Sequence, residues 1–158
     1  MRLIFSIIYI AALGILSHCI GEALPRRWFD PDAGLYAPRK WEQGGRFYQK
    51  LKVQRWKDFM PDMSKVMPDM VHKGISMTDG SAAVARVAVE TCVAEAVHWA
   101  LLLLSGGIYL LYPTGLGMAI TIIYALSHLP FIIIQRYNRP TLSLLAKKMK
   151  QREERMRK

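Results

Sequence analysis

Three long apolar segments constrain the fold of this chain more than any other feature of its sequence. Residues 3–20 and 116–134 contain no aspartate, glutamate, lysine or arginine. As helices, both are long enough to cross the roughly 30 Å hydrocarbon core of a bilayer. Residues 82–112 can form one further helix without interruption, and its second half is the third apolar segment. We predict a single membrane domain over residues 1–158, all-α, with about three transmembrane helices.

The first apolar segment has a second interpretation, a cleaved signal peptide. The string "LSHC" at Leu16–Cys19 resembles a lipoprotein cleavage box. However, His18 is bulky where that box needs a small residue, and no A-x-A site follows cleanly. Arg26 and Arg27 flank the segment on its C-terminal side, as expected for an uncleaved anchor. We predict that residues 3–20 are retained as the first span.

The distribution of charge predicts how the chain is oriented. The net charge is +10, and residues 135–158 carry nine Lys/Arg against two Asp/Glu. Residues 21–80 carry eleven against eight, whereas the turn at residues 113–115 carries no charge. The positive-inside rule places the long loop and the tail in the cytoplasm, with the N-terminus and the turn outside. Attraction to anionic lipid explains the basic character without a nucleic-acid partner.

The cytoplasmic loop contains a predicted helix over residues 46–59. Its basic and aromatic residues are mixed, which fits a helix lying on the membrane surface, and equally a short solvated helix. The string "MPDM" follows at residue 60 and again at residue 67. Methionine pairs can bind copper, but the prolines in both copies favour a loop here.

The short turn at residues 113–115 makes the second and third spans an antiparallel hairpin. In such a hairpin, residues equally far from the turn in sequence lie at the same depth in the membrane. Counting outward from the turn therefore brings Glu90 and Glu95 near the depth of "QRYNRP", which starts at Gln135. Pairing the carboxylates with Arg136 or Arg139 would lock the two helices together. Such a buried ion-pair cluster is one explanation for ionisable groups at the start of an apolar helical segment.

A catalytic site is the other explanation, and it depends on His98. Glu95 and His98 are three residues apart and neighbours on one helix face, and Glu90 lies within an arc of roughly 140° with them. An imidazole beside a carboxylate is suited to act as a general base on a hydroxyl. We predict His98 and Glu95 as catalytic. The candidate substrate-binding residues are Arg136 and Arg139 for anionic groups, Asn138 for the oxyanion, Glu90, and more weakly Trp56 and Lys57.

Several other chemistries fit the sequence worse. Glu-x-x-His occurs once, whereas a di-iron carboxylate site needs the motif twice. The four histidines form no H-x-x-H or H-x-x-x-H pair, which argues against a membrane desaturase. There is no G-x-S-x-G, P-loop or zinc-type C-x-x-C. We therefore predict no bound metal or cofactor.

Three strings together resemble one known family. They are "RFYQKLKVQRWKD", "ETCVAEAVHW" and "LPFIIIQRYNRP", and the resemblance runs from about Leu24 to Leu145. It points to the glycosyl-4,4'-diaponeurosporenoate acyltransferase family, a bacterial membrane family associated with the last step of staphyloxanthin-type carotenoid synthesis. The resemblance implies transfer of a fatty-acyl group to the primary hydroxyl of a glucose on a carotenoid acid. The implied donor is an acyl thioester, acyl-CoA or acyl carrier protein.

Two questions stay open at this point. The chain departs from the family pattern at Cys92, Val93 and Thr141, where the family has basic residues. A glycolipid therefore fits as acceptor as readily as a carotenoid glycoside. The alternative to an enzyme is a small membrane subunit that scaffolds pathway enzymes, alone or as a homo-oligomer, with a purely structural Glu/His/Arg cluster.

Overall fold

The computed structural model describes residues 1–60 and 80–157, and every regular element within these ranges is helical. Three helical stretches are long and apolar enough to cross a membrane: Arg2–Ala23, Ser81–Leu111 and Gly115–Met156. For the described residues, the prediction of an all-α chain with three such helices is confirmed. The loop predicted over the "MPDM" repeat lies almost wholly outside the described residues and stays a prediction.

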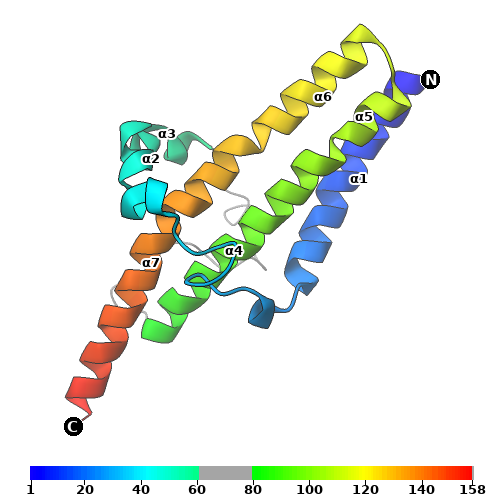
Figure 1. Cartoon of the computed structure of the whole chain (residues 1–158). Coiled ribbons are helices and arrows are strands. Elements are labelled where there is room, and N and C mark those ends of the chain that lie inside the picture. The colour runs from blue at the N-terminus through cyan, green and yellow to red at the C-terminus, as the bar shows by residue number, and fades with distance from the viewer. Residues whose placement is uncertain (61–79, 158) are drawn as a thin grey trace. The chain divides into compact units, whose positions relative to one another are not determined.

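The chain divides into two compact units. We call Met1–Pro25 with Val93–Ile132 the apolar unit, and Arg26–Cys92 with Ile133–Lys158 the basic unit. The names follow their composition, because most of the charged residues belong to the second unit. Figure 1 labels the helices from which both units are built.

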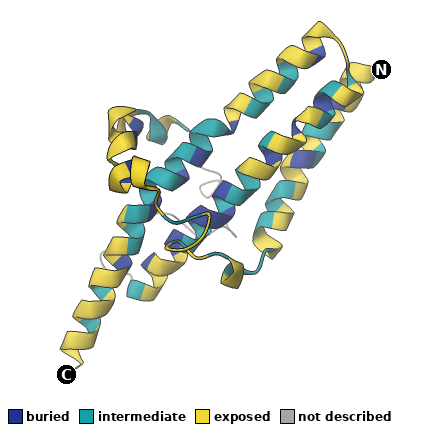
Figure 2. Ribbon diagram, viewed as in Figure 1, coloured by how far each residue is buried: buried dark blue, intermediate teal, exposed yellow. Residues whose placement is uncertain are grey.

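In the apolar unit, helix α1 (Arg2–Ala23) lies beside helix α5 (Gly106–Leu111), as Figure 1 shows. The hydroxyl of Tyr9 donates a hydrogen bond of 2.9 Å to the carbonyl oxygen of Leu104. A Cβ added to Gly107 would collide with the ring of Tyr9, so the two helices approach closely because this residue is glycine. The rest of α1 is mostly exposed (Figure 2), as expected of a helix whose apolar side chains face lipid.

Residues 82–112, predicted as one uninterrupted helix, form two helices instead. Helix α4 (Ser81–Leu104) ends just before Ser105, and α5 follows directly. The hydroxyl of Ser105 donates to the carbonyl oxygen of Leu102 over 2.6 Å. This local hydrogen bond competes with the backbone ladder, and two glycines follow it. The interruption is slight, because Ser105 itself keeps helical backbone angles.

Residues Tyr112–Thr114 connect α5 to helix α6 (Gly115–Ser127), and the two helices contact each other. The hydroxyl of Thr114 caps α6 by accepting a hydrogen bond of 3.1 Å from the backbone N–H of Gly117. This cap satisfies one of the free N–H groups at the start of the helix. The carbonyl group of Tyr112 fills the space where a Cβ on Gly117 would lie.

The basic unit starts with short helical turns, and the structure corrects our prediction of one helix over residues 46–59. Lys52 has a left-handed backbone with φ of 53°, and a right-handed helix cannot continue through such a residue. The indole N–H of Trp56 instead donates to the carbonyl oxygen of Leu51 over 3.1 Å. The elements in this part of the chain are η1 (Arg26–Trp28), η2 (Lys40–Gly45), α2 (Arg46–Lys50), α3 (Val53–Trp56) and η3 (Lys57–Phe59).

Helix α7 (Leu129–Met156) extends well beyond residue 134, where we placed the end of the third span. It includes Pro140, which has no N–H to donate to the carbonyl oxygen four residues earlier, that of Arg136. Beyond Pro140 most residues of α7 are exposed (Figure 2) and many are basic, so this part is a polar continuation of an apolar helix.

Candidate functional site

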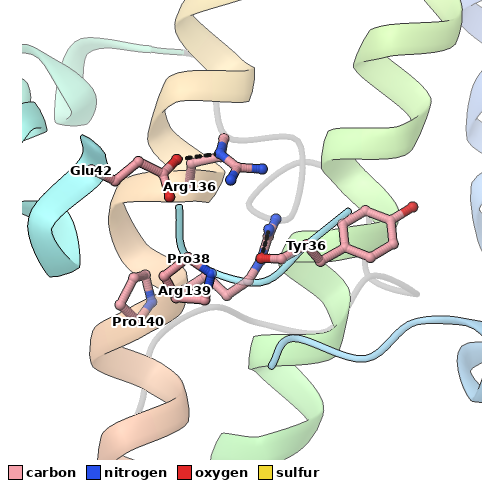
Figure 3. Close-up of a pocket in the computed structure, with 6 residues that line it drawn as sticks. All are labelled: Tyr36, Pro38, Glu42, Arg136, Arg139 and Pro140. Atoms are coloured by element: carbon pink, nitrogen blue, oxygen red, sulfur yellow. Dashed lines mark hydrogen bonds and ion pairs between the residues drawn. The ribbon is translucent and has the colours of Figure 1, made fainter. Parts of the chain in front are cut away.

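Glu42 is the centre of a buried polar cluster in the basic unit (Figure 3), with only 2% of its surface exposed. Its carboxylate accepts hydrogen bonds from Arg136 Nε at 2.5 Å and from the Tyr48 hydroxyl at 2.5 Å. The backbone N–H of Arg39 donates to the other carboxylate oxygen over 2.6 Å. A buried carboxylate needs a cation and several donors to offset its lost hydration, and Glu42 has both.

The local backbone explains how Tyr48 reaches Glu42. Gln43, Gly44 and Gly45 all have positive φ, at 49°, 64° and 97°. Three left-handed residues in a row kink the chain directly after the carboxylate, and α2 then starts at Arg46. Glycine adopts this conformation without strain, which is the reason for "GG" at this point.

The cluster changes the acidity of both groups. Burial by itself raises the pKa of Glu42, but the hydrogen bonds from Arg136, Tyr48 and the Arg39 backbone outweigh it and hold that pKa below its ordinary value. For Tyr48, burial and then the hydrogen bond to the negative carboxylate raise the pKa of the phenol well above its ordinary value. Glu42 is therefore charged and Tyr48 neutral at physiological pH.

The guanidinium of Arg136 has further protein partners. It donates to the carbonyl oxygens of Leu35 at 3.3 Å and Ala37 at 3.4 Å. A small pocket with about 150 Å³ of empty volume lies beside it. That volume is below the roughly 300 Å³ at which ligand pockets begin, so the pocket is too small for a whole acyl donor. Its lining residues are Tyr36, Pro38, Glu42, Arg136, Arg139 and Pro140 (Figure 3).

Arg139 is the most deeply buried cation of the basic unit among the described residues, with 1% of its surface exposed. Its Nε and one Nη donate to Thr91, to the hydroxyl oxygen at 2.9 Å and the carbonyl oxygen at 3.1 Å. The other Nη donates to the carbonyl oxygen of Tyr36 at 3.0 Å, and the Tyr36 ring centroid lies 5.4 Å from the guanidinium carbon. This geometry matches the fork of donors that only arginine offers.

Glu90 forms a two-pronged ion pair with Arg26, with both nitrogen–oxygen distances 3.0 Å. From the sequence we expected Arg136 or Arg139 as its partner. Arg26 instead lies six residues after the end of the first apolar segment, where the sequence favours a topological signal. The pair ties η1 to α4 within the basic unit.

In the apolar unit, His98 and His128 are paired. Their Nδ1 atoms lie 3.3 Å apart. The His98 ring also stacks on Phe131, with centroids 4.6 Å apart and planes 10° from parallel. His128 is 7% exposed, and its Nε2 has no hydrogen-bond partner among the described residues. Tyr124 meets the His128 ring edge to face at 4.8 Å.

Glu95 lies in the same unit, with 3% of its surface exposed. The indole N–H of Trp99, one helical turn further along α4, donates to its carboxylate at 3.4 Å. Glu95 and His98 thus lie in the apolar unit. The other predicted site residues belong to the basic unit: Glu90, Trp56, Lys57, Arg136, Asn138 and Arg139.

The three remaining predicted residues are Asn138, Lys57 and Trp56. Asn138 is half-buried on α7, next to the two clustered arginines in sequence. The ammonium of Lys57 lies 5.7 Å from the centroid of the Tyr137 ring, close enough for a cation–π contact. The indole N–H of Trp56 donates to the backbone carbonyl oxygen of Leu51, as described above.

The sequence did not reveal several residues of these clusters. Glu42 is the most important, and its signal was weak: one carboxylate before a pair of glycines in a stretch that we interpreted as irregular chain. Its partner Arg136 is 94 residues away, so no local spacing connects them. Also missed were Arg26 as an ion-pair partner, Tyr36, Tyr48 and Thr91.

Comparison with known proteins identifies the family. The profile described as glycosyl-4,4'-diaponeurosporenoate acyltransferase matches residues 25–148. A protein of that name from Staphylococcus aureus strain bovine RF122 / ET3-1 is 30% identical over 140 residues, 86% of this chain and 82% of that protein. The protein of the same name from strain USA300 is 29% identical over the same shares. No solved structure gives a significant match. The chain therefore belongs to the glycosyl-4,4'-diaponeurosporenoate acyltransferase family and is an acyltransferase.

Proposed function

We propose that the chain moves a fatty-acyl group from an acyl thioester onto the primary hydroxyl of a sugar. The donor is acyl-CoA or acyl carrier protein, and the acceptor is a glycosylated carotenoid or a similar glycolipid. Family membership supports the acyltransferase reaction and the staphyloxanthin-type pathway. The three apolar helices support an enzyme that meets its lipid substrate in the membrane.

The proposed enzyme is a multi-pass protein of the bacterial cell membrane, with its N-terminus outside and its C-terminus in the cytoplasm. Its second and third spans form an antiparallel hairpin, and its basic loop lies at the cytoplasmic surface. The brief connection Tyr112–Thr114 and the contact between α5 and α6 support the hairpin. The basic residues at 135–158 support the orientation.

The observation that carries the mechanism is the environment of His98. This imidazole follows the buried carboxylate of Glu95 by one helical turn, and its ring is held against Phe131. His98 takes the proton of the sugar hydroxyl while the hydroxyl oxygen attacks the thioester carbonyl. The carbon–sulfur bond then breaks, and the departing thiolate takes the proton from His98. Glu95 orients the imidazole and stabilises its positive charge.

The remaining predicted residues bind the substrates in this proposal. Arg136 and Arg139 bind the anionic groups of the donor, and Asn138 helps to hold the developing oxyanion. Arg136 holds two loop carbonyl oxygens through longer hydrogen bonds, of 3.3 and 3.4 Å, which a phosphate oxygen can replace with stronger charge-assisted bonds. Glu90 holds Arg26 in place, and Trp56 and Lys57 form the rim of the substrate-binding site.

A second function is favoured by one specific observation. Arg139 already has three hydrogen bonds to protein oxygens and is fully buried, which is the arrangement of a structural cation. For Arg139 this favours the structural role of the Glu/His/Arg cluster, as in a subunit that scaffolds a lipid or pigment pathway, over binding of an anionic donor. It predicts that changing His98 while keeping the fold leaves acyl transfer unchanged.

Mass spectrometry of lipid extracts tests the proposal. Cells that supply glycosylated carotenoid and glycolipid acceptors would carry the wild type, His98→Gln, His18→Gln or no protein. We expect acceptors heavier by one fatty-acyl group with the wild type and with His18→Gln, a matched histidine change on α1. His98→Gln should lack them. Acylated acceptors at wild-type levels with inserted His98→Gln would contradict the mechanism and favour the scaffold.

A further inference from the structure

The polar end of α7 has two different sides. Towards the protein, Leu142, Ala146, Met149 and Glu153 follow one another at helical spacing, and each of them is buried or half-buried. The carboxylate of Glu153 accepts two hydrogen bonds from Ser81 at the start of α4, from the backbone N–H at 2.8 Å and from the hydroxyl at 2.7 Å. This double contact fixes which side of α7 faces the rest of the basic unit.

The opposite side of α7 carries Lys148, Arg152 and Arg155, which we call the basic strip. These residues are four and three positions apart, so they lie one above the other on a single face. All three are exposed, and within the part of the chain that the structure describes none of them is in an ion pair. The nearby carboxylates of Glu153 and Glu154 start roughly 100° around the helix from the strip. The strip therefore presents positive charge alone.

An anionic membrane surface also attracts such charges, but the basic strip lacks the apolar residues that a bilayer selects. A helix that lies in the membrane surface buries an apolar face among the acyl chains. Between Lys148 and Arg155 the only apolar residue is Met149, which is half-buried on the other side of the helix. The strip is completed by Gln151, which is polar and exposed. This composition suits the surface of an acidic protein better than the interior of a bilayer.

The size of the pocket beside Arg136 limits which part of an acyl donor it can hold. Its empty volume of about 150 Å³ is too small for a whole donor, so most of the donor needs a second place to bind. The basic strip starts nine residues after Arg139 on the same helix. Nine helical residues span about 14 Å along the axis. The strip is thus near enough to hold the body of a donor whose reactive end reaches the pocket.

We propose that the basic strip docks an acyl carrier protein, which then presents its acyl thioester to the enzyme. This inference rests on the proposed function, and it selects the carrier protein over acyl-CoA as the donor. Acyl carrier proteins are small acidic proteins that hold the acyl chain on a long, flexible arm. The acidic surface pairs with Lys148, Arg152 and Arg155, while the arm reaches towards Arg136. Charge complementarity of this kind speeds the encounter of two proteins.

Two double variants test the docking surface with a matched control. Lys148→Gln/Arg155→Gln removes two charges from the basic strip. Lys150→Gln/Arg157→Gln removes a lysine and an arginine with the same spacing of seven residues from the other side of this segment. Glutamine favours a helix about as strongly as the residues that it replaces, so the helix should be kept in both.

The assay compares two donors that carry the same acyl chain. Full-length protein in nanodiscs of zwitterionic lipid receives a palmitoyl-loaded bacterial acyl carrier protein or palmitoyl-CoA, with a glucosylated carotenoid acid as acceptor. We expect the KM for the loaded carrier protein to rise about tenfold in the strip variant and to stay within about twofold in the control. The KM for palmitoyl-CoA should stay within about twofold in both variants.

Three results would overturn the docking of a carrier protein. Equal rises in KM for the two double variants would mean that only the net charge attracts the donor. A defect of the strip variant that appears only in nanodiscs with anionic lipid would assign the strip to the membrane surface. Transfer from palmitoyl-CoA, with none from the loaded carrier protein, would exclude the carrier protein as donor.

A binding measurement without acceptor separates this inference from the proposed function. Fluorescence anisotropy of a labelled, palmitoyl-loaded carrier protein reports its binding to the nanodiscs. Binding that only the strip variant loses, together with no transfer to any acceptor by the wild type, would overturn the proposed function and keep the docking surface. Transfer by the wild type, together with equal binding by both double variants, would overturn the docking surface and keep the proposed function.

Discussion

Two buried polar clusters, one in each unit of the chain, differ in how far their hydrogen-bonding groups are satisfied. In the basic unit, Glu42 and Arg139 each have several hydrogen bonds to protein groups. In the apolar unit, His128 keeps one buried nitrogen without a partner among the described residues. The first arrangement is what stability requires, and the second is what stability alone would remove.

The difference separates groups that hold the fold from groups that act. Glu42 and Arg139 each form several hydrogen bonds with protein groups, which leaves fewer of their hydrogen-bonding positions for a ligand. A histidine pair with one unsatisfied nitrogen retains such capacity. We therefore expect changes to Glu42 and Arg139 to lower stability, and changes to the histidine pair to act mainly on rate.

The largest expected effect on stability comes from Glu42→Ala. The change leaves the guanidinium of Arg136 and the hydroxyl of Tyr48 without their shared acceptor. Removing one partner of a buried ion pair costs about 3–5 kcal/mol. The free energy of unfolding in micelles, measured by titration with SDS, checks this value.

A matched control is available in the same unit. The pair between Asp32 and Lys147 has a distance of 2.6 Å, but its side chains are 46% and 60% exposed. Asp32→Asn should cost at most about 0.5 kcal/mol, as exposed ion pairs do. Equal losses for Glu42→Ala and Asp32→Asn would show that burial of the Glu42 cluster contributes nothing.

The next largest effect is expected for Arg139→Lys. Lysine keeps the charge but cannot reach both oxygens of Thr91 and the carbonyl oxygen of Tyr36 with one ammonium group. We expect a loss of about 2–4 kcal/mol in the same unfolding assay. Arg55→Lys, at an exposed position, should be nearly neutral. A neutral Arg139→Lys would mean that only the charge of Arg139 matters.

A smaller effect is expected where α1 approaches α5 in the apolar unit. Gly107→Ala forces the Tyr9 ring to move and breaks its hydrogen bond to Leu104, at a cost of about 1–2 kcal/mol. Gly106→Ala meets open space and should be neutral or slightly stabilising, because alanine favours a helix. The midpoints of thermal unfolding of the Gly107→Ala and Gly106→Ala variants measure this difference. Equal midpoints would show that α1 and α5 do not approach each other at Gly107 as closely as the structure has it.

The smallest expected effect is a dependence of stability on pH from the Glu42 cluster. The pKa of Glu42 in the folded protein lies below its ordinary value of 4.5. The unfolded chain therefore takes up the proton first, and stability falls as the pH decreases below about 4.5. The pKa of Tyr48 is raised above 10.0, so stability also falls as the pH increases beyond about 10.

Unfolding midpoints measured across the pH range check both limits. Glu42→Gln should flatten the acid limb, and Tyr48→Phe should flatten the alkaline limb. An unchanged acid limb in Glu42→Gln would assign that dependence to another carboxylate.

The sequence predicted the spans well because a span is a local property. Runs without charge at residues 3–20 and 116–134 correspond to α1 and to α6 with the start of α7. The family followed from short strings such as "QRYNRP", which the profile match confirms. Both kinds of signal lie within a few turns of helix, so one sequence is sufficient to detect them.

The rest depends on contacts that no local pattern encodes. The partner of Arg136 lies in η2, which ends in three left-handed residues, and a left-handed residue also breaks the predicted helix at Lys52. Lysine has no intrinsic preference for that conformation, so its neighbours must impose it. The same holds for Arg26. Its position near an apolar segment indicates a topological signal, and its ion pair with Glu90 is seen only in the folded chain.

The turn at Tyr112–Thr114 has a practical consequence for mapping the chain in its bilayer. A side chain at Gly115 meets open space, whereas one at Gly117 would collide with the carbonyl group of Tyr112. Gly115→Cys is therefore the position at which to attach an impermeant maleimide, once the native Cys19 and Cys92 have been replaced. Labelling of intact cells at this single atom would report which side of the bilayer the turn occupies, without a bulky fusion partner.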